Sequence, residues 1–182
     1  MELTPVRNCF GYSVYKTENG ATVKMKKGTG KVEVNDKGVL IVSGGEKVQV
    51  EGTRGDDKIV VKDSSVSLIG TGSGKDRLLL DNCTYKQYNS FWGTGSAIYT
   101  GGAWYRKKNK DDCAEIMIKG DFNGYIGAQQ GAGKGWGDDS DAHRDHIMIN
   151  GNNKGRINVD THDKVQIKGE KGSICNTTVY YM

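Results

Sequence analysis

The sequence predicts an all-β protein: a right-handed parallel β-helix, or β-solenoid, with coils of about 27 residues and one aromatic-rich insertion. Three observations predict this fold class. Short apolar strands recur along the chain, their spacing is regular, and turn-forming residues separate them, with 27 glycines against a single proline. No segment of useful length shows the apolar period of a helix. We therefore expect one domain over residues 1–182.

Ten short segments carry apolar residues at alternate positions, which places those side chains on one face of an extended chain. Each is bounded by Gly, Asp, Asn or Ser, the residues that turns favour. In chain order the expected strands are residues 32–34, 39–41, 48–50, 59–61, 66–68, 78–80, 116–118, 147–149, 157–159 and 165–167. Regular strands with a low apolar content indicate an elongated fold with a thin core.

The spacing of the strands indicates how many of them make one coil. Val32 and Ile59 lie 27 residues apart, and so do Ile147 and Ile174. Three short strands fit within that period, which is typical of a three-sided parallel β-helix whose coils stack on one another. The same offset also aligns the turn residues between strands, so we favour three sides.

A second spacing supports an alternative fold. Val48 and Val66 lie 18 residues apart, and Ile59 and Leu78 lie 19 apart. Two strands fit within that shorter period, which would make a flattened, two-sheet β-roll. A β-sandwich is a further alternative, because short strands separated by frequent turns are typical of it too.

Composition excludes some classes of protein. The net charge of +4 comes from 26 basic and 22 acidic residues, a mixed balance that does not by itself indicate a nucleic-acid binder. No apolar run approaches the length of a membrane span, and no signal peptide is visible. The four cysteines have no CxxC spacing, so a zinc ribbon is not indicated, and their disulfide state stays open.

Two stretches near the middle of the chain repeat one motif: GTRGDDKIV (52–60) and TGSGKDRLL (71–79). Each has two glycines, then an aspartate two positions before a branched apolar residue. The repeated residues are Gly52, Gly55, Asp57, Gly72, Gly74 and Asp76. The pattern resembles the glycine–aspartate repeats of hemolysin-type, repeats-in-toxin calcium modules. The resemblance implies calcium as a ligand of these residues, with Asp57 and Asp76 as the carboxylate ligands.

The same residues have a second interpretation, which stays open beside the first. Glycines supply the positive φ that tight corners need, and an aspartate side chain can accept hydrogen bonds from the amides of its own turn. On this interpretation the motif repeats because the chain turns the same corner twice, without a metal ion.

A polar cluster lies within a Gly/Asp-rich loop that we expect over residues 120–146. Asp139, Asp141, His143 and Asp145 alternate, so an extended backbone would place all four on one face. Carboxylates that close repel one another unless a cation or a proton lies among them. Asp139 and Asp141 are therefore candidate metal ligands, and all four are candidate catalytic residues. A solvated loop is the alternative.

Residues 83–113 interrupt the repeat and hold seven of the 15 aromatic residues. We expect an inserted loop, because a solenoid tolerates insertions and inserted loops often carry binding residues. Trp92, Tyr99, Trp104 and Tyr105 are the candidate ligand-binding residues for a glycan or a host or cell-surface protein. The alternative is a local core that packs the loop onto the strands, with Cys83 and Cys113 as a potential disulfide.

These observations favour a non-enzymatic binding or structural module that is secreted or exposed at a cell surface, without a visible signal peptide. A segment of a bacterial or phage toxin, adhesin, effector or fibre, stabilised by calcium, would fit. The alternative is a β-helix lyase or hydrolase acting on an acidic polysaccharide, since paired carboxylates serve glycoside hydrolysis. The basic stretch WYRKKNK (104–110) is the sole feature that points to nucleic acid, and acidic residues follow it at once.

Overall fold

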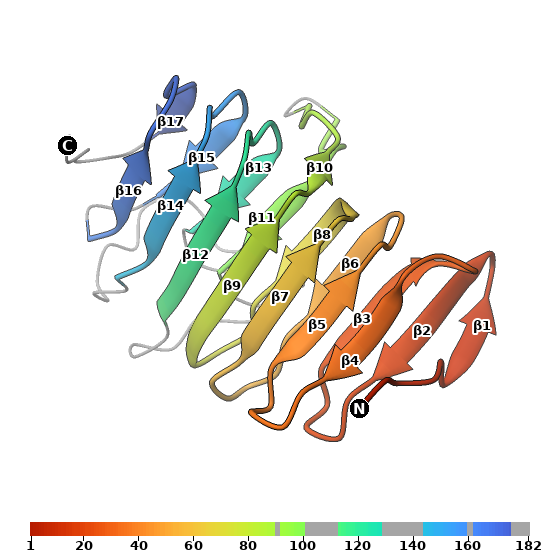
Figure 1. Cartoon of the computed structure of the whole chain (residues 1–182). Coiled ribbons are helices and arrows are strands. Elements are labelled where there is room, and N and C mark those ends of the chain that lie inside the picture. Colours follow the sequence, from red (N-terminus) through yellow and green to blue (C-terminus); the bar gives the residue numbers. More distant parts are fainter. Residues whose placement is uncertain (90–91, 101–112, 129–143, 160–161, 176–182) are drawn as a thin grey trace.

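The structure is a computed structural model that describes residues 1–89, 92–100, 113–128, 144–159 and 162–175. The described residues form strands and turns and contain no helix, so the all-β prediction is confirmed. The strands belong to two sheets that lie one behind the other (Figure 1). None of these residues forms a helix long and apolar enough to cross a bilayer.

Both sheets are built from strands that come from most of the length of the chain. Sheet A has seven strands, in the order β16 (Lys164–Ile167), β14 (His146–Asn150), β12 (Cys113–Lys119), β9 (Lys75–Asp81), β7 (Lys58–Lys62), β5 (Leu40–Ser43) and β4 (Lys31–Val34). Sheet B has ten strands, and its main order is β1 (Arg7–Cys9), β2 (Tyr12–Lys16), β3 (Thr22–Lys26), β6 (Val48–Glu51), β8 (Ser65–Gly70), β11 (Ala97–Tyr99), β13 (Tyr125–Gly127), β15 (Arg156–Asn158) and β17 (Ser173–Cys175), with β10 (Thr84–Tyr85) also paired to β8. From β5 to β9 successive strands alternate between sheet A and sheet B, and the same alternation holds from β11 to β17.

The hydrogen-bonded register corrects the expected coil length. Val48 pairs with Val66 and Ile59 with Leu78, both in parallel, and these are the pairs of the 18- and 19-residue spacing. Val32 instead pairs antiparallel with Val42, so its 27-residue offset from Ile59 reflects no contact between neighbouring strands. The expected three-strand period is therefore wrong here, because each sheet receives every second strand rather than every third.

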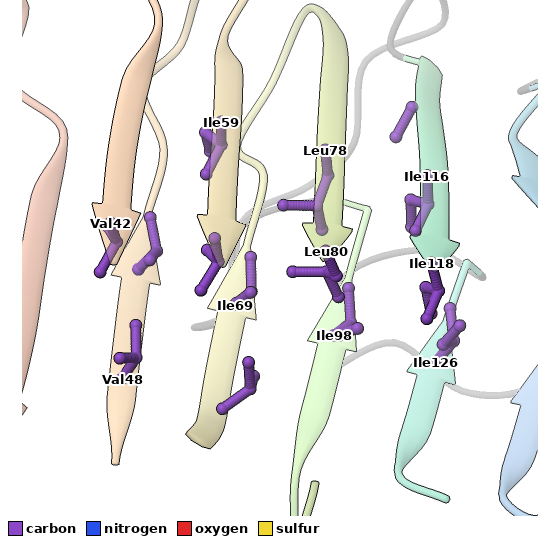
Figure 2. Packing of buried hydrophobic residues seen from close by; sticks show 14 of the residues in the cluster. Val42, Val48, Ile59, Ile69, Leu78, Leu80, Ile98, Ile116, Ile118 and Ile126 are labelled. Carbon is purple, nitrogen blue, oxygen red and sulfur yellow. The ribbon is translucent and has the colours of Figure 1, made fainter. Parts of the chain in front are cut away.

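A single apolar core lies between the two sheets. In every long strand of sheet A the buried side chains alternate with exposed or half-buried ones, as in β12, where Ala114, Ile116 and Ile118 are buried. Figure 2 shows the buried side chains of neighbouring strands as rows, with Ile59, Leu78 and Ile116 in one of them. Because each row continues from strand to strand, the parallel register is fixed by burial of the aliphatic face.

The first strands of the chain pair differently from the rest. β1, β2, β3 and β6 are successive antiparallel neighbours in sheet B, and β4 and β5 are antiparallel in sheet A. β3 thus covers the backbone groups of β6 that face away from β8 (Figure 1). An antiparallel hairpin protects the start of the parallel region from edge-to-edge pairing.

All ten expected strands overlap observed ones, and seven further strands were not expected. The alternation in residues 39–41 predicted the wrong face, because Leu40 and Val42 are buried there and Ile41 points outward. β11 lies within residues 83–113 and β13 within residues 120–146, so those two ranges are in part regular members of sheet B. Each contributes one inward aliphatic residue, Ile98 or Ile126. The four cysteines form no disulfide in the structure, which gives no support to a bond between Cys83 and Cys113.

The glycines of the repeated motif give a first prediction. A Cβ at Gly52 would overlap the carbonyl oxygen of Thr71 on the neighbouring corner, whereas a Cβ at Gly55 would meet nothing closer than the Thr53 hydroxyl at 3.9 Å. We expect Gly52→Ala to lower the free energy of unfolding by about 2 kcal/mol or more, because the backbone must shift to admit the methyl group. Chemical denaturation measures the loss. Gly55→Ala is the matched control, and equal destabilisation of both variants would contradict the described stacking of the corners.

Candidate functional site

The aspartates of the repeated motif lie inside the protein. Asp57 and Asp76 are both buried, each two positions before an inward aliphatic residue near the start of a strand of sheet A. Asp145 and Asp163 occupy the same position before β14 and β16 and are buried as well. The repeated glycine–aspartate motif of residues 52–80 thus marks one kind of corner, where the chain passes from sheet B into sheet A.

Three of these carboxylates accept a hydrogen bond from the backbone at the start of the preceding strand of sheet A. Asp76 Oδ1 accepts a hydrogen bond of 3.0 Å from the Asp57 amide, and Asp163 Oδ1 accepts one of 2.9 Å from the Asp145 amide. Asp145 Oδ1 accepts a bond of 2.7 Å from the amide of Ala114, which pairs with Asp76 in the strand register. We call Asp57, Asp76, Asp145 and Asp163 the aspartate ladder. It satisfies buried amides at corners that strand pairing alone does not reach.

Asp57 also closes its own corner. Its Oδ2 atom accepts bonds from the Thr53 amide at 2.5 Å and from the Thr53 hydroxyl at 2.8 Å. Burial raises the pKa of the Asp57 carboxyl above its ordinary value, although the two Thr53 bonds act in the opposite direction. This is the capping geometry of the second interpretation of the motif, in which the aspartate holds the turn.

The other predicted metal ligands surround this bond network. Gly72 has a φ of +101°, and a Cβ there would overlap the carbonyl oxygen of Thr53. Gly74 likewise lies against the backbone of Gly55 on the preceding corner, so the glycines let two corners stack. The described residues contain no group of three or more His, Cys, Asp and Glu side chains arranged to hold a metal ion.

The predicted acidic cluster lies mostly outside the described residues, which do not include Asp139, Asp141 and His143. The remaining member, Asp145, belongs to the aspartate ladder. Its side chain is buried and accepts a hydrogen bond from the amide of Ala114 on the neighbouring strand, so its carboxylate stabilises a corner.

The aromatic residues of the insertion divide between the two faces of sheet B. Tyr85 packs with its ring centroid 4.9 Å from that of Phe122, a fully buried residue, in an edge-to-face contact. Burial raises the pKa of the Tyr85 phenol. This contact is the local packing that the alternative interpretation of the insertion expected, and it anchors the segment to the core.

Three other tyrosines gather on the outer face of sheet B. Tyr88 stacks on Tyr125 with ring centroids 4.7 Å apart, and Tyr99 meets Tyr125 edge to face at 5.9 Å. We call Tyr88, Tyr99 and Tyr125 the tyrosine patch. Tyr99 and Tyr125 stand beside Ile98 and Ile126, which point inward, so the rings point away from the core.

Glycines on the neighbouring strands leave room for these rings. Gly70 and Gly127 are the register partners of Tyr99 on its two sides, and a Cβ at Gly127 would lie 3.0 Å from the rings of Tyr99 and Tyr125. Next to Gly127 in the same row comes Asn158. The patch is therefore an aromatic surface with a buried polar residue, Asn158, next to it.

Polar groups next to the patch are held in place by hydrogen bonds. Asn158 Nδ2 donates to the Tyr125 hydroxyl at 3.0 Å, and Arg156 Nε donates to Asn158 Oδ1 at 3.1 Å. Burial raises the pKa of the Tyr99 and Tyr125 phenols, opposed at Tyr125 by the bond from Asn158, so both rings carry neutral hydroxyls at physiological pH. The site thus offers aromatic faces and hydrogen-bonding groups without a phenolate charge.

Comparison of the chain with protein-family models, with curated proteins and with solved structures gave no match.

Of the residues predicted to bind a ligand, two lie among the described ones. Tyr99 belongs to the tyrosine patch, and Trp92 is exposed over 72% of its surface in the segment that leads into β11. Trp104 and Tyr105 lie outside the described residues. Tyr88, Tyr125 and Asn158 were not among the predicted residues, although Tyr88 lies within the aromatic insertion. The signal for Tyr125 was its place in YIG, a short strand whose register brings it beside Tyr99.

The aspartate ladder gives a second prediction. Asp57→Ala removes the acceptor of the Thr53 amide, so we expect the free energy of unfolding to fall by about 1–3 kcal/mol. Asp57→Asn keeps an acceptor and removes the charge. Burial raises the pKa of the Asp57 carboxyl above 3.8, so the fold disfavours the ionised form relative to the unfolded chain. The free energy of unfolding therefore falls as the pH rises above that value.

We therefore expect Asp57→Asn to be at least as stable as the wild type at pH 7, and its advantage to vanish as the pH falls below 3.8. Thermal unfolding between pH 3 and pH 7 measures both effects, with Asp36→Ala, at an exposed aspartate, as the control. A large loss of stability in Asp57→Asn at neutral pH would contradict the assigned role.

Proposed function

We propose that the chain is a non-enzymatic binding module, secreted or exposed at a cell surface, which binds a glycan through the tyrosine patch. The observation that carries the proposal is the stacking of Tyr88 on Tyr125 beside Tyr99, on the outer face of a rigid sheet. Outward aromatic rings next to fixed polar groups are what a sugar-binding surface requires.

The chemistry of a sugar fits both parts of this surface. One face of a pyranose ring presents C–H groups, which pack on the face of an aromatic ring, while its hydroxyls donate and accept hydrogen bonds. Arg156, a half-buried residue beside the patch, would donate to such hydroxyls, while the buried Asn158 holds the Tyr125 hydroxyl in place. The neutral phenols add further donors and acceptors, so binding needs no charge on the tyrosines.

We further propose that the alternation of strands between the two sheets makes a flattened, two-sided β-solenoid. The parallel pairs from β5 to β9, and from β11 to β17, support this, since each corner lies on the one before it. A solenoid presents long flat faces on a stiff support, which suits a segment of a toxin, adhesin, effector or fibre. The face of sheet B would then be the glycan-binding side.

Calcium as a ligand of the first two corners stays a proposal that rests on the resemblance of their glycine–aspartate pattern. The amide bonds described above use Oδ2 of Asp57 and Oδ1 of Asp76. An ion would be bound by these carboxylates together with carbonyl oxygens of the glycine turns, the hard oxygen ligands that calcium prefers.

The glycan proposal gives a third prediction. Affinity electrophoresis against a panel of soluble neutral and acidic polysaccharides should retard the wild-type protein on at least one of them. We expect Tyr99→Ala to weaken that binding about tenfold or more, because it removes one ring face and loosens the contact with Tyr125.

The matched control is Tyr12→Ala. Tyr12 is a half-buried tyrosine of the same sheet, far from the patch, with the Lys24 ammonium 4.5 Å above its ring. The Tyr12→Ala variant should bind the polysaccharide like the wild type. Equal loss in both variants, or no retardation on any polysaccharide of the panel, would overturn the glycan proposal.

The calcium proposal gives a fourth prediction. Thermal unfolding should show a higher midpoint in millimolar calcium than in excess EDTA, because an ion that binds only the folded state stabilises it. The double variant Asp57→Ala with Asp76→Ala should unfold at the same midpoint in both conditions. Identical wild-type midpoints with and without calcium would remove the ion from the proposal and leave the motif as a corner.

A further inference from the structure

The outer face of sheet A carries a row of apolar side chains that crosses five neighbouring strands. The row consists of Ile41, Val60, Leu79, Met117 and Met148, which we call the apolar ladder. Each of them is the Cα partner of the next. Each also stands between two buried residues of its own strand, so its side chain points away from the core.

Cations dominate the rest of this face. On β7, β9, β12 and the flanking strand β16 the outward charged residues are Lys58, Lys62, Lys75, Arg77, Lys119 and Lys164, with Asp81 and Glu115 opposite in sign. At the other edge of the sheet β4 adds one charge of each sign, Lys31 and Glu33, and Glu33 is the partner of Ile41. Lys58 and Lys62 lie two positions before and after Val60, so the ladder has positive charge on both sides.

The carboxylates of Asp81 and Glu115 are already engaged. Arg77 Nε lies 3.1 Å from Glu115 Oε2, and Lys119 Nζ lies 2.7 Å from Asp81 Oδ2. Both cations remain open to solvent, with 71% and 47% of their side-chain surfaces exposed. The four remaining lysines of these strands give the face a net positive charge, and Met117, at 36%, is among the exposed large apolar residues.

We propose that this face docks an acidic amphipathic helix of a partner protein, lying along the apolar ladder across the strands. Strands lie about 4.8 Å apart, so the ladder extends over roughly 19 Å, the length of a helix of about 13 residues. Apolar side chains on one side of a helix recur about every 5–6 Å, close to the spacing of the ladder. Glutamates flanking the helix stripe would meet the lysines on both sides.

Charge and shape favour this occupant over the others. A second copy of the same face would bring lysines against lysines, which costs free energy. A bilayer surface is two-dimensional, so a stripe one residue wide buries little apolar area in it for the polar area that is covered as well. A glycan prefers aromatic rings to aliphatic side chains, and those lie on the opposite sheet.

The test is fluorescence anisotropy with a labelled peptide of about 14 residues, with leucine at heptad positions a and d and glutamate at e and g. We expect it to bind the full chain, and to bind more weakly as salt screens the lysines. Two control peptides carry lysine in place of glutamate, or the same residues with the leucines distributed around the helix, and neither should bind.

Protein variants assign the binding to this face. Leu79→Asp puts a charge in the middle of the ladder, and Lys58→Glu with Lys62→Glu reverses the charge beside Val60; each should weaken binding about tenfold or more. All of these side chains point outward, and circular dichroism checks that both variants fold. Tyr99→Ala, on the other sheet, should bind the peptide like the wild type.

Three results would overturn the proposal. One is equal binding of the acidic and the shuffled peptides. The second is unchanged binding of the acidic peptide by both the Leu79→Asp and the lysine variants. The third is that peptide binding does not depend on Leu79, whereas binding to vesicles with anionic lipid does, or self-association measured by sedimentation does.

Discussion

The structure depends on one constraint: inward side chains of neighbouring strands must lie above one another in both sheets at once. Ile59, Leu78 and Ile116 meet this constraint in sheet A, and Ile69, Ile98 and Ile126 meet it in sheet B. Once the strands are in register, the corners between them must stack as well. The corners stack because glycines leave room for the neighbouring backbone and because buried aspartates accept hydrogen bonds from the preceding corner.

The same register arranges the outer faces. Residues that point outward from paired strands also form rows, so side chains far apart in the sequence become direct or diagonal neighbours. The direct partner of Tyr99 is Gly127, which has no side chain, and Tyr125 lies diagonally from Tyr99. In this way Tyr99 and Tyr125 come together on sheet B, and five aliphatic residues come together on sheet A. The two proposed surfaces thus follow from the core, because burial of the inward rows fixes where every outward side chain lies.

Much of the fold could be predicted from alternation alone, since ten strands were visible as alternating apolar residues, although Ile41 in one of them points outward. The choice between the two spacings could not be made from the sequence, although the 18- and 19-residue pairs were visible in it. The chain varies the length of its corners, so Val32 matches Ile59 in sequence offset but pairs with Val42. Strands with one inward aliphatic residue, such as those of Ile98 and Ile126, leave too little pattern to detect. For the site, composition pointed to Tyr99, whereas Tyr125 and Asn158 could be placed beside it only through the register. The aspartates were visible as a repeated motif, yet their burial and their bonds to the previous corner depend on how the corners stack.

The most direct measurement of the central claim, the register of the stacked strands, is nuclear magnetic resonance of the isotope-labelled protein, with backbone contacts assigned around Ile147. The account predicts contacts between the backbone of Ile147 and those of Ile116 and Val165, its parallel neighbours on either side. Backbone contacts between Ile147 and Ile174, the pair separated by 27 residues, would contradict it. In that case the two sheets, and with them both proposed surfaces, would have to be abandoned.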